Sequence, residues 1–280
     1  MGNTEKQIQW FPGHMAKTLR QMEKSIRDVD VIVEIIDSRI PYSSQNPVLR
    51  RIGRHKKRIF ILTKEDLADP NITKQWENYF KENGAEVIIL NTKQSKSKKK
   101  LESFINEYIT TKMSTFKFGK PRLMFVGIPN VGKSSVINSL LGEIIARAED
   151  RPGVTRGKQW YTSSSYELLD MPGVLWPKFE NDKIGYNLAF TGAIRDEVFD
   201  VESIASSLLV ELRELYPQNL EKRSGIVVEE GKTGYELLLE YAQKRGFLLK
   251  GGELDTERAA KAVLYDLRNG KFGRISLEKP

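Results

Sequence analysis

The stretch Gly127-Ile128-Pro129-Asn130-Val131-Gly132-Lys133-Ser134 decides the fold of this 280-residue chain. It matches the pattern G-x-x-x-x-G-K-S, follows the apolar run 122–127 and precedes a helix-like stretch, which is the setting that a phosphate loop requires. Its glycines let backbone amides wrap phosphates, Lys133 can reach the outer phosphates, and the Ser134 hydroxyl can hold Mg²⁺. We therefore expect nucleotide contacts from Asn130, Val131, Gly132, Lys133, Ser134 and Ser135.

The runs around this loop predict an α/β fold with a mostly parallel sheet covered by helices on both faces. Short, β-branched stretches indicate buried strands at 31–36, 58–62 and 86–90, and 166–170 is predicted as a further strand that ends in an acid. The stretch 71–84 has helical spacing, and we expect its aromatic side chains Trp76, Tyr79 and Phe80 to pack in the core.

The strand-like runs stop near residue 178, and helical periodicity takes over. It covers 203–216, 234–245 and 255–267, with glycines or a proline between these stretches. We therefore predict a nucleotide-binding domain over 1–177 with an N-terminal arm, followed by a small all-helical domain over 178–280.

The choice of base follows from Thr63-Lys64-Glu65-Asp66, at the end of a predicted strand. This segment resembles the N-K-x-D motif of GTPases, with Thr63 where Asn is usual. The Asp66 carboxylate can accept two hydrogen bonds from guanine that adenine does not offer, and the Lys64 stem can lie along the base. On its own the segment is equally consistent with a charged turn, and its place after a strand favours GTP and GDP as ligands.

Three further segments complete the expected nucleotide site. Asp170-Met171-Pro172-Gly173 resembles D-x-x-G, in which the acid meets Mg²⁺ and the glycine amide faces the γ-phosphate. Thr155 is similar to the switch threonine that completes the Mg²⁺ shell. Asn91 and Thr92 follow a strand where GTPases place a second guanine-contacting loop. The predicted metal ligands are therefore Ser134, Thr155 and Asp170.

The order of these motifs is unusual. Ordinary GTPases read phosphate loop, switch threonine, D-x-x-G, N-K-x-D and guanine loop, whereas here the last two come first. Joining the ordinary termini and cutting between the two halves would leave every strand in place. The sequence therefore predicts a circularly permuted P-loop GTPase domain.

The composition limits which classes of partner the protein is expected to bind. The net charge is +8, and lysines and arginines gather at 50–58 and 93–100. Such clusters favour a polyanionic partner such as RNA over a merely solvated surface, because phosphate neutralisation releases counterions. The chain has no cysteine and no run of bilayer length, and its first residues lack a secretory signal. We expect a cytoplasmic protein with neither membrane nor DNA as partner; the oligomeric state stays open.

Two more segments point to a known family. Trp10-Phe11-Pro12-Gly13-His14-Met15 and Asp37-Ser38-Arg39-Ile40-Pro41, together with the phosphate loop and the permuted order, resemble the ribosome biogenesis GTPase A family of bacterial circularly permuted GTPases. The resemblance covers nearly the whole chain. It implies GTP hydrolysis in assembly of the large (50S) ribosomal subunit, contact with its RNA, and a helical C-terminal domain that docks there.

The family resemblance also implies a catalytic residue. Val174 and Leu175 follow Gly173, and aliphatic chains cannot orient water as a glutamine can. A histidine from the N-terminal segment is implied instead, and His14 suits this better than His55, which lies in a basic stretch. Asn130 is similar to the position that helps hold K⁺ in potassium-stimulated GTPases.

Two other functions compete with the GTP-driven switch. One is an RNA-binding assembly factor in which the nucleotide is mainly structural. The other is a GTPase in RNA modification, which we rank last because the helical part shows no catalytic residues of that kind.

Overall fold

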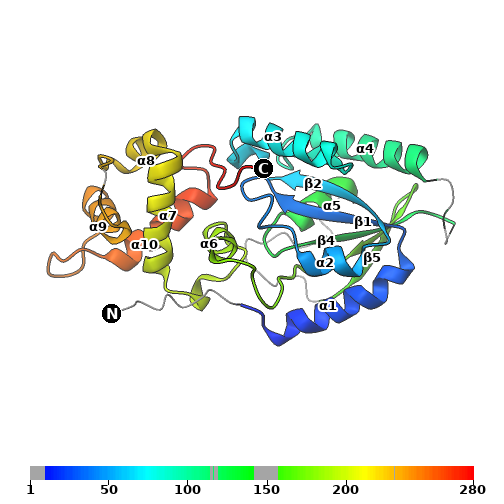
Figure 1. The fold of residues 1–280 in the computed structure, drawn as a ribbon, viewed down its shortest axis with the longest axis horizontal. Coiled ribbons are helices and arrows are strands. Elements are labelled where there is room, and N and C mark those ends of the chain that lie inside the picture. Colours follow the sequence, from blue (N-terminus) through cyan, green and yellow to red (C-terminus); the bar gives the residue numbers. More distant parts are fainter. Residues whose placement is uncertain (1–9, 114–115, 117–118, 142–156, 230) are drawn as a thin grey trace. The chain divides into compact units, whose positions relative to one another are not determined.

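The computed structural model describes residues 10–113, 116, 119–141, 157–229 and 231–280. A six-stranded sheet in the order β3-β2-β1-β4-β6-β5 forms the centre of its larger part (Figure 1). Neighbouring strands pair in parallel, except that β5 is antiparallel to β6. The strands are β1 (Val31–Asp37), β2 (Lys57–Thr63), β3 (Glu86–Ile89), β4 (Arg122–Gly127), β5 (Gln159–Thr162) and β6 (Glu167–Asp170).

The predicted mostly parallel α/β architecture is confirmed. The expected strands occur within one residue of their predicted ends. The strand β5 was not predicted, because it lies at the edge of the sheet and its residues carry no buried apolar pattern. Trp160, for example, is 39% exposed.

Helices cover both faces of the sheet. They are α1 (Gly13–Ser25), α2 (Pro47–Ile52), α3 (Pro70–Glu82), α4 (Ser97–Lys112) and α5 (Lys133–Leu141). The connections β1-α2-β2 and β2-α3-β3 run in one direction along the sheet, and β4-α5-β6 runs in the other. Because such crossovers are right-handed, α2 and α3 lie on one face and α5 on the opposite face, where α4 packs against it.

The helix α3 shows how the sequence builds this core. The Asp69 carboxylate accepts hydrogen bonds from the backbone N–H groups of Asn71 and Ile72 and so caps the helix. Trp76 and Phe80 are buried against side chains of β1, β2 and β3. Tyr79, expected in the same core, is instead 45% exposed. Its ring lies at the border of the buried face, where it contacts the rings of Trp76 and Phe80 edge-on and leaves its other side to solvent.

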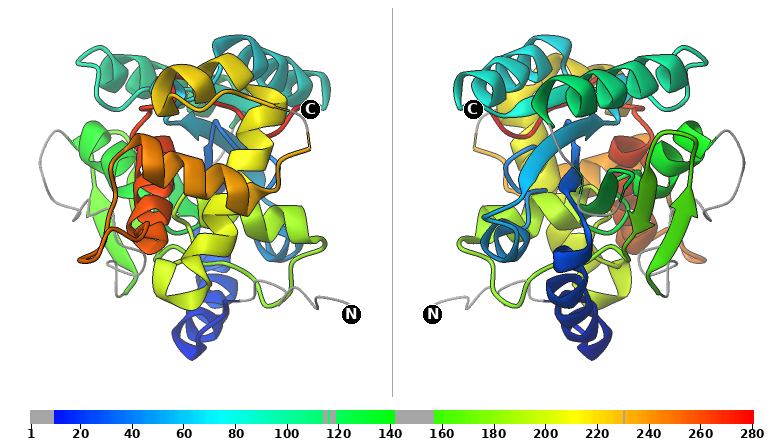
Figure 2. Two further views of the ribbon diagram at one scale, coloured as in Figure 1. Left: turned by 90° about the vertical axis from the view of Figure 1, so that its left-hand side faces the viewer. Right: turned by 90° about the vertical axis from the view of Figure 1, so that its right-hand side faces the viewer.

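A second compact unit spans Phe179–Leu277. It contains α6 (Asp182–Phe190), α7 (Val201–Leu215), α8 (Pro217–Ser224), α9 (Gly234–Lys244) and α10 (Thr256–Arg268). The helices α7, α9 and α10 pack on one another (Figure 2). No helix in the described part of the chain is long and apolar enough to cross a membrane.

The last three residues belong to the sheet unit rather than to the helical one, together with Trp10–Lys178. The Glu278 carboxylate accepts hydrogen bonds from the backbone N–H of Tyr42 at 2.7 Å and of Ser43 at 3.1 Å. The indole N–H of Trp76 donates to the Glu278 carbonyl oxygen at 3.1 Å. The tail therefore braces the loop that follows β1.

Candidate functional site

The phosphate-loop motif lies between β4 and α5, as its pattern predicted. Gly132 has a φ of +95° and Asn130 a φ of +58°, both in the left-handed region. Asn130 is a residue type that tolerates this conformation, and glycine adopts it without steric cost. The loop thus curls back over the end of β4, with Lys133 and Ser134 in the first turn of α5.

Asp170 ends β6, the strand beside β4, and its carboxylate pairs with the ammonium group of Lys133. Both side chains are buried. Burial raises the pKa of the Asp170 carboxyl, and the Lys133 charge offsets part of that effect. The structure therefore brings the lysine predicted to bind phosphate and the predicted metal ligand into direct contact.

Gly173 lies against the phosphate loop itself. A Cβ atom at this position would come within 2.9 Å of the Pro129 Cα atom, so only glycine allows this approach. The adjacent Val174 N–H donates to the Gly127 carbonyl oxygen at 3.2 Å. The D-x-x-G segment and the phosphate loop are thus in backbone contact.

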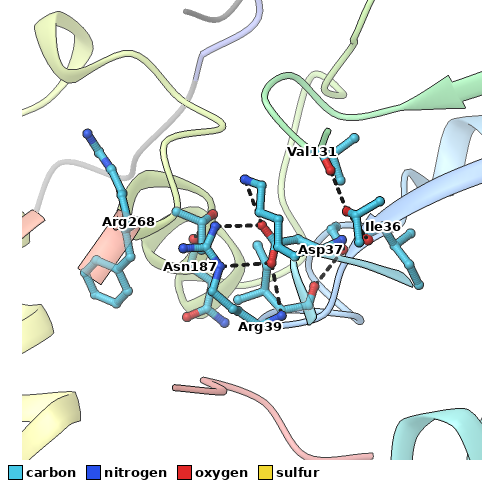
Figure 3. Close-up of polar contacts among 12 residues, drawn as sticks. Ile36, Asp37, Arg39, Val131, Asn187 and Arg268 are labelled. Carbon is cyan, nitrogen blue, oxygen red and sulfur yellow. Dashed lines mark hydrogen bonds and ion pairs between the residues drawn. The ribbon is translucent and has the colours of Figure 1, made fainter. Parts of the chain in front are cut away.

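The T-K-E-D motif follows β2 and is tied to the phosphate loop by its first residue. The Thr63 hydroxyl lies 2.6 Å from the Val131 carbonyl oxygen and 3.0 Å from that of Ile36, and it can donate to one of them at a time (Figure 3). Threonine therefore makes the link to the phosphate loop at the position where the motif usually has asparagine. The next residue, Lys64, has a φ of +56° and turns the chain into a short 3-10 helix at Glu65–Leu67.

Asp66 lies beside the loop that follows β3. Its carboxylate accepts a hydrogen bond from the Lys93 ammonium group at 2.7 Å, in a pair where the Lys93 side chain is 73% exposed. The Asn91 side chain accepts from the Lys93 backbone N–H at 3.1 Å, and Thr92 lies between these residues. The two predicted guanine-contacting segments are therefore neighbours.

All of these segments follow strands that pair in parallel, so they meet at the carboxyl edge of the sheet. The chain changes direction along the sheet between β1 and β4, which is where open α/β sheets bind their ligands. The motifs are permuted along the chain but adjacent in space.

Comparison with known proteins agrees with this geometry. The family model described as "50S ribosome-binding GTPase" matches residues 122–228. Ribosome biogenesis GTPase A of Priestia megaterium is 41% identical, over 98% of this chain and 97% of its own length. The Thermotoga maritima protein of the same name is 31% identical, over 98% of this chain and 95% of its own.

The chain belongs to the ribosome biogenesis GTPase A family.

Two solved structures have a similar fold. The GDP-bound structure of YlqF has a TM-score of 0.71 at 28% identity, and the match covers 93% of this chain and 99% of that one. The GNP-bound crystal structure of YlqF from T. maritima has a TM-score of 0.68, over 94% and 98%. This protein is accordingly a GTPase that binds guanine nucleotide and acts in ribosome biogenesis, with a permuted GTPase domain and a helical C-terminal part.

A buried charge cluster at the end of β1 adds to this GTPase site. The Arg39 guanidinium group forms two hydrogen bonds with the Asp37 carboxylate, at 3.0 and 2.7 Å, and the Lys64 ammonium group lies 3.2 Å from it (Figure 3). Burial alone would raise the pKa of Asp37, but the Arg39 and Lys64 charges outweigh it and hold the pKa well below its usual range. Asp37 thus anchors the lysine predicted to lie along the base.

Sequence reasoning assigned Asp37 no role beyond the family resemblance. The available signal was an acid that ends a buried strand, at the same sheet edge as the other motifs. Its partner could not be identified, because Asp37 and Lys64 are 27 positions apart and meet only through the pairing of β1 with β2.

The structure describes all but one of the remaining residues that the sequence analysis singled out. Thr155 lies outside the described residues. His14 is exposed in the first turn of α1, and its ring contacts that of Trp10 edge-on with 6.5 Å between centroids. Val174 is fully buried, so it presents no side chain to a water molecule. Ser135 lies in the first turns of α5.

The basic cluster at 50–58 is smaller on the surface than the sequence indicated. Arg58 pairs with the buried Glu34 and donates to the Leu49 carbonyl oxygen at 2.9 Å. Lys56 donates to the Val29 carbonyl oxygen at 2.6 Å. These two residues hold the sheet unit together, whereas Arg50, Arg51, Arg54 and Lys57 are exposed.

Proposed function

We propose that this GTPase is a nucleotide-dependent switch in assembly of the large ribosomal subunit. In its GTP form it binds the RNA of the precursor particle, and hydrolysis releases it. The observation that carries this proposal is the contact between Gly173 and the backbone of Pro129. A segment this close to the phosphate loop must respond to the γ-phosphate, as switch segments of GTPases do.

The name of the matching family model, which refers to binding of the 50S ribosome, supports the choice of the large subunit. A mouse relative that is 32% identical, over 96% of this chain and 90% of its own, is named mitochondrial ribosome-associated GTPase 1. The structures of YlqF with GDP and with GNP support a protein that holds both nucleotide states.

The proposed nucleotide contacts follow from the placement of the motifs. Asp66 accepts hydrogen bonds from guanine after Lys93 releases it. Exposed ion pairs contribute only about 0–1 kcal/mol, so this exchange costs little. Lys64 lies along the base, and Asn91 and Thr92 border it. Lys133 moves from Asp170 to the phosphates, whose negative charge replaces that of the carboxylate.

The residues at the phosphate loop also fit Mg²⁺. The Ser134 hydroxyl and the Asp170 carboxylate are oxygen donors on adjacent elements, and Mg²⁺ prefers one or two such protein ligands together with phosphate oxygens. When bound, the ion neutralises charge that develops on the phosphates. Thr155 is proposed as a third ligand, and Asn130 as a contact for K⁺.

His14 is proposed to orient the attacking water. Its exposed position in the first turn of α1 leaves the imidazole accessible, and Val174 offers no alternative group. A neutral imidazole can accept a hydrogen bond from that water.

The helical unit is proposed to dock on ribosomal RNA. Tyr235 and Tyr265 are 50% and 59% exposed, and lysines such as Lys222 and Lys250 are exposed on the same unit. Exposed tyrosine rings can stack on unpaired bases, and lysines contact phosphates. Binding should therefore weaken steeply as salt rises.

Particle binding in different nucleotide states tests the switch. Full-length protein is sedimented with purified large-subunit particles in the presence of a non-hydrolysable GTP analogue, GDP or no nucleotide. We expect binding with the analogue to be strongest, and Lys133→Ala to lose this difference. Equal affinity in all three states would instead indicate an RNA-binding assembly factor in which the nucleotide is mainly structural.

A further inference from the structure

A buried amide links the D-x-x-G segment to the N-terminus of α2. Asn46 is 1% exposed. Its side-chain nitrogen donates to the Val174 carbonyl oxygen at 3.0 Å, and its side-chain oxygen accepts from the Val48 N–H at 3.0 Å. One end of the amide therefore caps a helix while the other end holds the residue next to Gly173.

The amide donates one of these hydrogen bonds and accepts the other, so the two contacts fix its orientation. The Val48 N–H needs an acceptor and the Val174 carbonyl needs a donor, and only one orientation of an Asn side chain supplies both. Aspartate or serine can cap a helix equally well, but aspartate cannot donate to Val174. Capping alone does not explain why this position carries asparagine.

The backbone at Asn46 is held firmly in place. Its backbone N–H donates to the buried Glu34 carboxylate at 3.3 Å, and Glu34 pairs with Arg58. Arg58 in turn donates to the carbonyl oxygen of Leu49 in α2. The start of α2 is thus held to the sheet at several points.

Val174 connects Asn46 to the phosphate loop through hydrogen bonds. Its N–H is bonded to the Gly127 carbonyl and its carbonyl to Asn46, so the peptide units on both sides of Val174 are each held by a hydrogen bond. The side chain is fully buried and adds a third restraint. A shift at Val174 must therefore move Gly173 relative to Pro129.

We propose that Asn46 is a positioning residue for GTP hydrolysis. It acts through the Val174 carbonyl and keeps the Gly173 amide aimed at the γ-phosphate. The inference rests on the proposed assignment of Asp170–Gly173 as the segment that faces this phosphate. Asn46 is buried and acts through the Val174 carbonyl, so its loss should affect the rate and not the binding of nucleotide.

Two substitutions separate the donor from the cap. Asn46→Asp keeps an acceptor for Val48 and removes the donor to Val174. Asn46→Ser keeps the cap, and its hydroxyl, one bond shorter than the amide nitrogen, no longer reaches the Val174 carbonyl oxygen. Serine introduces no charge near Glu34, so it tests the proposal even if the aspartate variant fails to fold. Asn181→Asp is the matched control, because Asn181 caps α6 through a hydrogen bond from Ile184 at 3.0 Å.

We expect kcat of full-length Asn46→Ser to fall on the order of 10–100-fold, since a small misplacement of a catalytic group has that effect. The Kd for GDP should stay within about twofold, and Asn181→Asp should match the wild type. Wild-type kcat in both Asn46 variants would overturn the proposal. A joint loss of kcat, GDP affinity and melting temperature would do so as well, because it indicates a merely structural role.

Gly173→Ala distinguishes failure of this inference from failure of the site assignment. The added methyl group would approach the Pro129 Cα atom within 2.9 Å. If Gly173→Ala hydrolyses GTP normally, the assignment of the γ-phosphate segment is wrong. If only Gly173→Ala is impaired, the assignment stands and the role of Asn46 is refuted.

Discussion

The Thr63 hydroxyl lies 2.6 Å from the Val131 carbonyl oxygen and so joins the T-K-E-D motif to the phosphate loop across 68 positions of sequence. Both residues are 1% exposed. A single buried hydrogen bond thus couples the two ends of the proposed nucleotide site.

Thr63→Val removes this hydroxyl with little change in shape. The Val131 carbonyl would then lack a buried donor, which costs about 1–3 kcal/mol. We expect the free energy of unfolding to fall by that amount and GDP affinity to fall with it. Urea unfolding and equilibrium nucleotide binding measure the two effects. Thr63→Ser should restore both, and if Thr63→Val binds GDP like the wild type, the hydroxyl does not organise the site.

Asp66→Asn should weaken GTP binding, because an amide cannot accept both hydrogen bonds from guanine. The expected loss is about 1.5–3 kcal/mol, the range for hydrogen bonds to a charged group. Xanthosine triphosphate should bind the variant better than it binds the wild type. Competition binding with the two nucleotides measures this preference, and an unchanged preference would show that Asp66 does not read the base.

His14→Ala should leave GTP affinity nearly unchanged, because the imidazole is proposed to act on water and not on the ground-state nucleotide. Turnover should fall by about 10²–10⁴-fold, the usual contribution of a positioned acid–base group. Single-turnover hydrolysis, alone and with large-subunit particles, measures the loss. His55→Ala is the matched control, since it removes the other histidine of the chain. Full particle-stimulated turnover in His14→Ala would mean that a backbone group, a bound ion or the ribosome positions the attacking water instead.

Asp37→Asn should destabilise the fold at neutral pH by about 3–5 kcal/mol, because it leaves Arg39 buried without its charge partner. The pKa of Asp37 is lowered by folding, so its stabilising effect is full above the ordinary value of 3.8. The effect shrinks as pH falls below that value toward the folded pKa. The difference between wild type and variant in urea unfolding should therefore narrow on acidification. The loss of unfolding free energy in Thr63→Val should not change with pH, because no titrating group is removed. A loss in Asp37→Asn that does not change with pH would contradict the lowered pKa of Asp37.

Local patterns in the sequence were sufficient to predict most of this fold. The phosphate loop, the buried strands and the helices over 203–216, 234–245 and 255–267 each follow from hydrophobic spacing and glycine positions within a few residues. The edge strand β5 was missed, because an exposed strand lacks that spacing. The tail at Glu278 was expected in the helical domain, but its hydrogen bonds lie in the sheet unit.

The long-range contacts that organise the site could not be predicted from local sequence patterns. Asn46 meets Val174 across 128 positions, and Lys133 meets Asp170 across 37. Such pairs depend on which strands are neighbours, and the permuted order hides that from the sequence. Arg58 illustrates the same limit, because only its burial beside Glu34 distinguishes it from the exposed arginines nearby.

The most direct test of the account is GTP turnover by the full chain, measured with and without purified large-subunit particles. The switch proposal predicts a steep rise when particles are added, which Lys133→Ala should abolish and which high salt should reduce as RNA contacts weaken. Turnover that does not change with particles, combined with equal particle affinity in GTP, GDP and no nucleotide, would contradict it.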